Sequence, residues 1–382
     1  MESIILNPTE NIRMDISRDF NFLDGYYISD DRRGKDSKII FAGRNDYTEE
    51  INNKKKKWCS LLGANDIDFR FLSGLHAHII IFMSLGNIGD KILLLPEQAG
   101  GHYSTEAILK RLGYNVLKIV PDDNNYCVNK EQTLETIKKH KPKFAFIDRS
   151  EGLYYEDFSW IKQTDIPYSV FDTSQYLTQI ISNYYHSPFN WGFNLILSST
   201  HKNFPGPQKA FLATKAKDSY WDKIISGSAT YISNSHPKEM FRVLQATESI
   251  DKIIDYSKLM IEISVKLENA LHKKGFPVIM KDDEKVPTQH IWSKFNSKNE
   301  CYNTFVDLEK LGIYTNFRLL PYNIGYGLRM GVGAAIQSGL RQEHIDLLAD
   351  IMTTCYEYGY SDMLYCKAQD LIKHMKLVGK FL

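Results

Sequence analysis

The sequence predicts an α/β fold with a mostly parallel sheet, followed by a smaller α+β domain. Short apolar segments alternate with helical segments between residues 46 and 235, which is the pattern of βαβ units. After residue 235 the pattern changes to long helical stretches with few strands. A chain of 382 residues is long enough for two such domains. We therefore expect an N-terminal arm over residues 1–45, a large domain over 46–235 and a small C-terminal domain over 236–382.

The large domain is expected to begin with a helix over residues 46–62, which Gly63 ends. Further helices are expected over residues 73–85 and 104–112. The expected strands are short and apolar, and they cover residues 67–72, 91–95, 115–120, 143–147, 168–171, 194–197 and 209–214. In a mostly parallel sheet with right-handed crossovers, the loops that follow the strands meet at one edge, where ligands usually bind.

The small domain is expected to contain a long helical stretch, two strands and a second helix, over residues 236–274, 289–295, 326–330 and 342–358. Residues 1–45 carry little periodicity, which favours an arm over a domain. A run of four lysines at residues 54–57 lies inside a helical pattern after Glu49 and Glu50, so a solvated helix face is the better interpretation than a phosphate site.

Composition excludes several classes of protein. Lys and Arg number 47 and Asp and Glu number 46, a balance that argues against a nucleic-acid-binding or membrane-binding protein. The five cysteines are scattered and never spaced as CxxC, which favours a reducing compartment over a disulfide scaffold or zinc ribbon. The amino terminus does not resemble a signal peptide, and the most apolar run, residues 79–83, is too short to span a membrane. We expect a cytoplasmic enzyme without a metal ion.

An acid and a lysine follow two neighbouring strands of the predicted sheet. Asp172 ends the strand SVFD, and the next strand, NLILSST, runs directly into His201 and Lys202. Pyridoxal 5′-phosphate (PLP) needs such a pair, because a lysine holds it as a Schiff base and a carboxylate keeps its ring nitrogen protonated. Either residue alone is more simply a turn aspartate or a surface lysine. Together, with SSTHKNFPGP between two strands, they favour a PLP site.

This segment resembles the fold-type I PLP enzymes, and within them the serine hydroxymethyltransferases and their aldolase and transaldolase relatives. The match is Ser-Ser-Thr-His-Lys-Asn followed by Gly206-Pro207, against the family's His-Lys-Thr-(x)-x-Gly-Pro. The resemblance implies the aspartate aminotransferase-like fold, with a mostly parallel seven-stranded sheet and a smaller C-terminal domain. It also implies that Lys202 is the Schiff-base lysine, that Asp172 pairs with the ring nitrogen, and that Ser199 and His201 flank the cofactor.

Two further segments are similar to cofactor-binding motifs of this family. Ser73, Gly74 and the amide of Leu75 would open a helix at the cofactor phosphate, since amides at a helix N-terminus bind anions. A Ser-Gly helix cap without a ligand is the alternative, and His76 and His78 are interpreted as surface or core histidines rather than ligands. In PEQAGGHYS, His102 would stack on the pyridine ring. The alternative is an ordinary loop histidine.

The resemblance also assigns contacts to Ser150, Arg329 and Thr9. Ser150 ends the segment KFAFIDRS and would lie near the ring hydroxyl, although a strand-end serine without a ligand is the alternative. Arg329, in YGLRMGVGAAIQSG, would grip the substrate α-carboxylate, since a guanidinium fork matches a planar carboxylate. A surface ion pair is the alternative for this arginine. Thr9, in LNPTEN, would be a second carboxylate contact.

Several positions depart from the family. The family's acid–base Glu is matched by Asp24, which is one methylene shorter, and its two tyrosines are replaced by Ile40 and Phe41. Gln175 replaces a histidine among the cofactor contacts, and Gln208 replaces an arginine. The phosphate-binding Gly-Gly of the neighbouring subunit is replaced by residues 233–235. These departures predict a reaction that does not use folate.

We therefore expect a PLP-dependent transferase or lyase of amino-acid metabolism or biosynthesis. It would make or break the Cα–Cβ bond of glycine or a β-hydroxy amino acid through a quinonoid, with an aldehyde as co-substrate. Lys202, Asp172, His102 and Asp24 would be catalytic. The alternatives are an aminotransferase, racemase, decarboxylase or condensing enzyme on the same scaffold, a folate-dependent hydroxymethyltransferase, and a non-enzymatic protein. A homodimer with shared active sites is expected, to which Tyr26, Phe41 or residues 233–235 would contribute.

Overall fold

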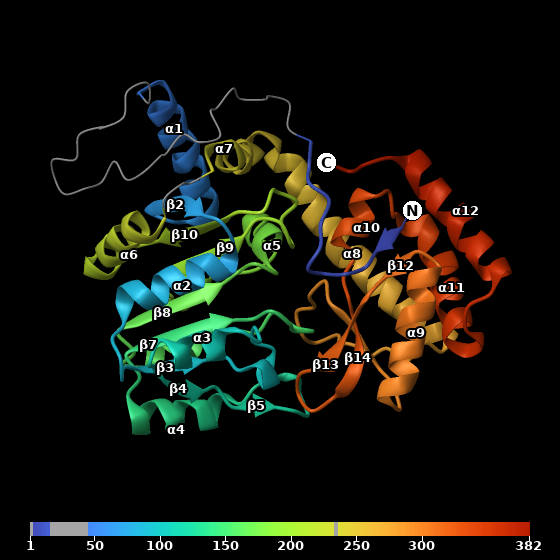
Figure 1. Cartoon of the computed structure of the whole chain (residues 1–382), viewed down its shortest axis with the longest axis horizontal. Coiled ribbons are helices and arrows are strands. Elements are labelled where there is room, and N and C mark those ends of the chain that lie inside the picture. Colours follow the sequence, from blue (N-terminus) through green and yellow to red (C-terminus); the bar gives the residue numbers. More distant parts are fainter. Residues whose placement is uncertain (1–2, 16–44, 233–235) are drawn as a thin grey trace.

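The computed structural model describes residues 3–15, 45–232 and 236–382, and its centre is a seven-stranded sheet (Figure 1). In sheet order the strands are β2 (Asp66–Phe71), β10 (Ala210–Thr214), β9 (Leu195–Ser199), β8 (Tyr168–Asp172), β7 (Phe144–Asp148), β3 (Lys91–Leu94) and β4 (Asn115–Lys118). Strands β9 to β4 are parallel neighbours, and only β10 runs antiparallel to the strands on either side of it. The predicted mostly parallel seven-stranded sheet is therefore confirmed.

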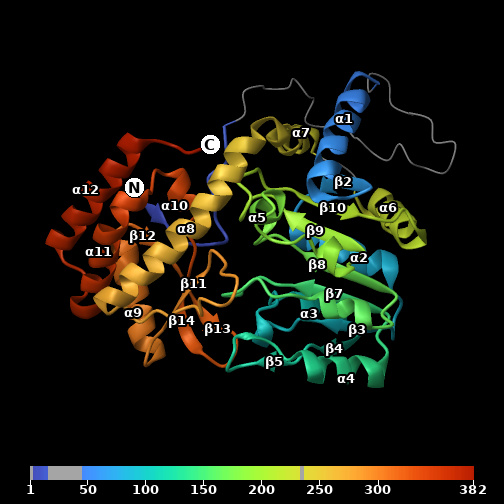
Figure 2. The ribbon, with the colours of Figure 1, turned by 180° about the vertical axis from the view of Figure 1, so that it is seen from behind.

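The central strands β7, β8, β9 and β10 are buried on both faces, whereas the edge strand β4 is partly exposed. In β8, Val170 packs into the core on the side of α2 and α6, and Phe171 packs into the core on the side of α1 and α5. Figures 1 and 2 show these two layers from opposite sides. The helices of this part are α1 (Asn45–Leu62), α2 (Gly74–Leu85), α3 (Thr105–Arg111), α4 (Lys130–His140), α5 (Leu177–Ile181) and α6 (Ser219–Tyr231), with a small hairpin of β5 (Pro121–Asp122) and β6 (Cys127–Val128).

The C-terminal part combines a three-stranded antiparallel sheet with packed helices. The sheet has the order β11 (Ile291–Lys294), β14 (Gly325–Met330) and β13 (Asn316–Leu320). The helices of this part are α8 (Ile250–Lys274), α9 (Lys298–Lys310), α10 (Gly333–Gln337), α11 (Ile345–Tyr358) and α12 (Asp362–Val378), whereas α7 (Pro237–Gln245) packs with α1 in the core of the large sheet. The predicted boundary near residue 235 falls within 233–235, outside the described residues, so the division into domains stays a prediction.

One predicted helix proves to be two. Residues 236–274 were expected to be continuous, but a 3-10 segment, Ala246–Ser249, separates α7 from α8. Within this segment the Thr247 hydroxyl donates to the Leu244 carbonyl at 3.2 Å. Beyond this break, α8 extends into the C-terminal part (Figure 2).

The described part of the N-terminal arm reaches both parts of the molecule. Ile4 and Ile5 form β1, which pairs in parallel with β12 (Ile313–Tyr314). Farther along, the Asn11 side chain donates to the backbone carbonyl of Lys202 at 2.6 Å. Residues 3–15 therefore connect the C-terminal part to the loop after β9. Among the described residues, no helix combines the length and the apolar character that crossing a membrane requires.

Candidate active site

The loop after β9 carries Lys202 and is fixed by hydrogen bonds on both sides. The Asn203 side chain accepts from the Thr178 amide at 2.8 Å and donates to the Gln179 side chain at 2.8 Å, which anchors the loop to α5. The turn closes at Gly206, where a Cβ atom would lie 2.6 Å from the Thr200 carbonyl oxygen. With the contact of Asn11 described above, these bonds hold the backbone that presents the lysine.

The ends of β8 and β9 are joined, which brings the predicted acid and lysine together. The Ser199 amide donates to the Ser174 hydroxyl at 2.8 Å, and the Thr173 amide donates to the Leu197 carbonyl at 2.7 Å. A cavity of about 150 Å³ lies at this edge of the sheet. Its lining residues are Ser73, Gly74, Leu75, His78, His102, Asp148, Ser150, Asp172, Ser199, His201, Lys202 and Gln208. Most of the residues predicted to bind the cofactor thus surround one space.

The amino end of α2 opens onto the same cavity. Ser73 caps the helix, and its hydroxyl accepts from the His76 amide at 3.2 Å. Gly74 lies so near β9 that a Cβ atom there would be 3.6 Å from the Ser199 Cβ atom. The unpaired amides and positive dipole end of a twelve-residue helix favour an anion, so this corner suits a phosphate group.

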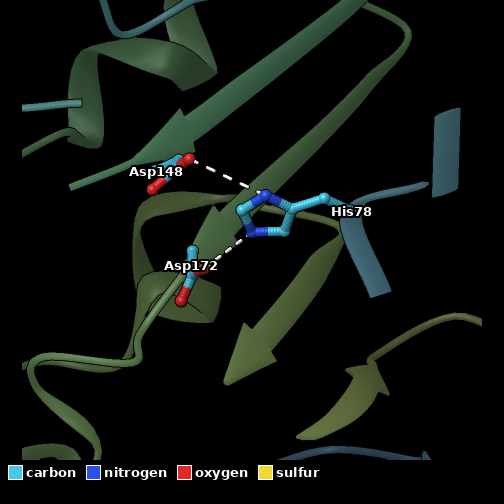
Figure 3. Close-up of side chains that lie close together, drawn as sticks. All are labelled: His78, Asp148 and Asp172. Atoms are coloured by element: carbon cyan, nitrogen blue, oxygen red, sulfur yellow. Dashed lines mark hydrogen bonds and ion pairs between the residues drawn. The ribbon is translucent and has the colours of Figure 1, made fainter. Parts of the chain in front are cut away.

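Asp172 is bonded to a histidine that sequence reasoning interpreted as a surface or core residue. The ring of His78 lies between two buried carboxylates, with Nε2 2.8 Å from Asp172 and Nδ1 3.8 Å from Asp148 (Figure 3). His78 is buried, as a core residue would be, but its ring also lines the cavity. Burial opposes ionisation of Asp172, yet the bond and charge of His78, with Lys202 nearby, lower the pKa of this carboxyl overall. Asp172 is therefore suited to pair with a protonated ring nitrogen.

His102 is a neutral ring at the cavity wall. Burial, reinforced by the charge of Lys202, lowers the pKa of His102 from 6.5 to about 4. The Ser104 hydroxyl lies 2.7 Å from Nδ1 and its amide donates to the same atom at 3.4 Å, so Nε2 carries the proton. A neutral imidazole can lie against an aromatic ring without bringing charge to it.

This shift predicts a pH dependence of stability. Between pH 4 and 6.5 the unfolded chain binds a proton at His102 that the folded chain does not, so the free energy of unfolding falls as the pH is lowered through this window. In PLP-free protein, His102→Phe is expected to make that decline shallower in urea titrations at several pH values. His186→Phe, at an exposed position, is the control. An equal decline in wild type and His102→Phe would contradict the assignment.

Arg329 lies beside the cavity, within a group of charged side chains. Its Nε donates to the Asn316 side chain at 3.1 Å, and its Nη1 lies 3.6 Å from the buried carboxylate of Glu151. Glu151 also contacts Arg318. Burial lowers the pKa of Arg329 to about 10, which leaves it charged at neutral pH. Glu151 thus lies between the two arginines, and Arg318 has a second acidic partner, since its Nη2 lies 3.4 Å from the Glu97 carboxylate.

Three predicted contacts are placed differently or cannot be placed. The Thr9 hydroxyl donates to the Asn7 side chain at 2.9 Å, and Gln175 accepts from the His290 ring at 3.2 Å. Neither residue belongs to the cavity lining, so their assigned contacts stay predictions. Asp24 lies outside the described residues, as do the positions expected to be lent by the partner subunit, Tyr26, Phe41 and residues 233–235.

The residues present fit PLP by their own chemistry. A lysine and an ionised carboxylate share a cavity with a helix N-terminus, which matches the aldehyde, the ring nitrogen and the phosphate of this cofactor. Three buried polar atoms of the residues that line the cavity, His78 Nδ1, Ser199 Oγ and His201 Nδ1, have no hydrogen-bond partner among the described residues. Such orphaned atoms at a cavity wall indicate a polar ligand.

Sequence reasoning missed three residues of the site. His78 lacked a signal because its partner is 94 residues away in the chain. Asp148 was taken only as part of a strand, although a strand-end acid beside Asp172 on the same edge could have been noticed. Gln208 was recognised as a departure from the family, and the structure places it in the cavity lining.

The chain is similar over most of its length to several named proteins. No protein-family model matches the chain. The serine hydroxymethyltransferase of Picrophilus torridus is 26% identical over 367 residues, which cover 92% of this chain and 84% of the relative. The fluorothreonine transaldolase of Streptantibioticus cattleyicolor is 26% identical over 295 residues, 76% of this chain and 46% of that protein. The L-threonine:uridine-5′-aldehyde transaldolase of a Streptomyces species is 25% identical over 307 residues, 78% of this chain and 71% of that protein.

A solved structure has the same fold. The L-threonine transaldolase of Pseudomonas fluorescens, in its internal aldimine state, superposes with a TM-score of 0.90 at 17% identity and covers all of this chain and 88% of its own. The predicted fold class is thereby confirmed.

Proposed function

We propose that this chain, which resembles serine hydroxymethyltransferases and threonine transaldolases over most of its length, is a PLP-dependent enzyme that acts on α-amino acids. Its reaction would be folate-independent aldol, retro-aldol or transaldol chemistry on glycine or a β-hydroxy amino acid. The observation that carries the proposal is the single cavity in which Lys202, Asp172 and the amino end of α2 meet.

The groups that would hold the cofactor have separate tasks. When bound, PLP supplies an electron-withdrawing ring that stabilises negative charge on the substrate Cα. Lys202 holds the cofactor covalently and afterwards moves a proton at Cα. Asp172 keeps the ring nitrogen protonated, and His102 holds one face of the ring. The amides of Gly74 and Leu75 bind the phosphate.

Arg329 would orient the substrate by its carboxylate. The bond that breaks must stand perpendicular to the cofactor ring, and a bidentate guanidinium contact sets that angle. Arg318 already contacts two carboxylates, Glu97 and Glu151. Arg329 contacts only one among the described residues, Glu151 at 3.6 Å, so it is the better placed of the two for a substrate carboxylate.

Arg329→Lys is expected to raise the KM for the amino acid about 10- to 100-fold, because lysine loses the bidentate contact. The affinity for PLP should stay within about twofold of the wild type, as Arg329 does not line the cofactor cavity. Steady-state kinetics and a PLP titration check both values. Arg318→Lys is the matched control on the neighbouring strand β13, and an equal rise of KM there would contradict the special role of Arg329.

The first experiment asks where PLP is attached and what it does. Purified protein is incubated with PLP, reduced with borohydride and digested, and mass spectrometry is expected to find the adduct on Lys202. Product analysis then compares glycine with aldehydes, L-threonine with aldehydes, L-serine with tetrahydrofolate, and an amino acid with a 2-oxo acid. Turnover only with L-serine and tetrahydrofolate, or only with an amino acid and a 2-oxo acid, would overturn the proposed reaction. No adduct would overturn the cofactor assignment.

The active form is proposed to be a homodimer with shared sites. The resembled family borrows residues across its interface, and Tyr26, Phe41 or residues 233–235 are the positions that correspond. Light scattering on the PLP-loaded protein should report twice the mass of one chain. A monomer that retains PLP and turns over would contradict the shared sites.

A further inference from the structure

His78 is held between two acids from neighbouring parallel strands. It lies on α2, one turn after the Ser73 cap, and is buried. Asp148 ends β7 and Asp172 ends β8, and the two residues are paired in register. In Figure 3 the imidazole bridges the two carboxylates, with a dashed line from each ring nitrogen. The edges of the ring pack against Phe146, at 4.8 Å between centroids, so little space remains for reorientation.

The hydrogen bonds around the three side chains decide where protons can reside. Asp172 uses one oxygen to accept from the Ser174 amide at 2.8 Å and the other to accept from His78 Nε2. Asp148 accepts from the Thr105 hydroxyl at 2.5 Å. His78 Nδ1 faces Asp148 at 3.8 Å and has no hydrogen-bond partner among the described residues.

Three charge arrangements avoid a lone pair facing a bare carboxylate. His78 is doubly protonated between two ionised acids, or it is neutral and either Asp148 or Asp172 carries the proton. A proton on Asp172 is the least favourable of these, because the Ser174 amide already donates to this carboxylate. The other two arrangements hold one proton between Nδ1 and Asp148 and leave Asp172 ionised with Nε2 donating to it.

Burial raises the pKa of Asp148 to about 6, while the pKa of Asp172 is lowered. The shared proton therefore lies between His78 and Asp148 and not on Asp172. Lys202 and His102 also face these groups.

We propose that His78 is a positioning residue for the cofactor: backed by Asp148, it holds Asp172 ionised and aimed at the pyridine nitrogen. The inference rests on the proposed PLP function, which it deepens. In the resembled family this position, in Ser-Gly-(Ser)-Gln-Ala-Asn, is an Asn, whose side-chain amide is uncharged and does not titrate. The histidine of this chain faces both carboxylates and places a titratable group behind Asp172. The three side chains also have ligand atoms within 4.8 Å of one another, as a metal site would, but their place beside Lys202 favours the cofactor role.

The test uses PLP labelled with 15N at the ring nitrogen, bound to the wild type, His78→Phe and His78→Gln. The 15N chemical shift reports whether that nitrogen is protonated, independently of turnover. His78→Phe should move the signal toward the unprotonated value and raise the PLP dissociation constant about 10- to 100-fold. His78→Gln, which keeps one donor toward Asp172, should give a smaller change in the same direction. His76→Phe, on the same helix and outside the cavity lining, is the matched control and should match the wild type.

The outcomes separate this inference from the proposed function. A wild type that forms no borohydride-trapped adduct at Lys202 would overturn the function itself. A wild type with that adduct, together with a folded His78→Phe that keeps the wild-type 15N shift and PLP affinity within twofold, would overturn the role of His78 alone. If circular dichroism shows that His78→Phe does not fold, the test rests on His78→Gln and Asp148→Asn. Both variants are expected to change the 15N shift of the ring nitrogen. An unchanged shift in both would overturn the inference. Retention of PLP that depends on added zinc would overturn it in favour of a metal site.

Discussion

Lys202→Ala is expected to remove the borohydride-trapped PLP adduct and to lower turnover about 10³-fold or more. The side chain has two tasks, the covalent hold on the cofactor and the proton transfer at Cα, and loss of proton transfer alone typically costs 10²- to 10⁴-fold. Mass spectrometry of the reduced, digested protein and a single-turnover assay measure the two losses separately. PLP should still bind without covalent attachment, since the amino end of α2 and Asp172 remain.

The matched control is Lys215→Ala. Lys215 follows β10 at an exposed position of the same segment, outside the cavity lining. It should retain both the adduct and turnover. An adduct that persists in Lys202→Ala would show that another lysine carries the cofactor and would invalidate the site as described.

The central sheet was predictable because local pattern and tertiary environment agree there. Residues of β8 and β9 are apolar on both faces, and parallel strands buried on both sides have that pattern. Since the carboxyl ends of parallel strands meet at one edge, the strand assignment alone predicted that Asp172 and Lys202 lie at the same edge of the sheet. The break between α7 and α8 was not predictable from the sequence pattern, because the 3-10 segment Ala246–Ser249 contains no Gly or Pro that would mark a helix end.

The parts of the site that escaped prediction depend on contacts between distant segments. His78 looks like any buried helix residue until α2 is placed against β7 and β8. Asn11 belongs to an arm without periodicity, yet it bonds to the Lys202 backbone across 191 residues. The role of Glu151 could not be predicted because its ion-pair partners, Arg318 and Arg329, come from the distant C-terminal sheet. Local sequence patterns do not predict such contacts, because they depend on how distant segments pack.

Asp172→Asn should lower turnover about 10²- to 10³-fold while the protein still folds and retains PLP on Lys202. Asparagine has nearly the same shape and can still accept from the Ser174 amide, but it has no negative charge to keep the ring nitrogen protonated. Substrate carboxylate binding through Arg329 is untouched, so the loss should appear in kcat rather than in KM. The visible absorption of the bound cofactor should change as well, because the charge of the ring changes.

The control for this variant is Asp165→Asn, an exposed acid just before the opposite end of the same strand, β8. It should leave kcat, KM and the spectrum unchanged. If Asp172→Asn raised KM and left kcat and the absorption spectrum as in the wild type, the carboxylate would be contacting substrate and not the cofactor ring. The buried pair of Asp172 and His78 would then have a structural role only, and the cofactor's ring nitrogen would need another partner along the edge formed by β7, β8 and β9.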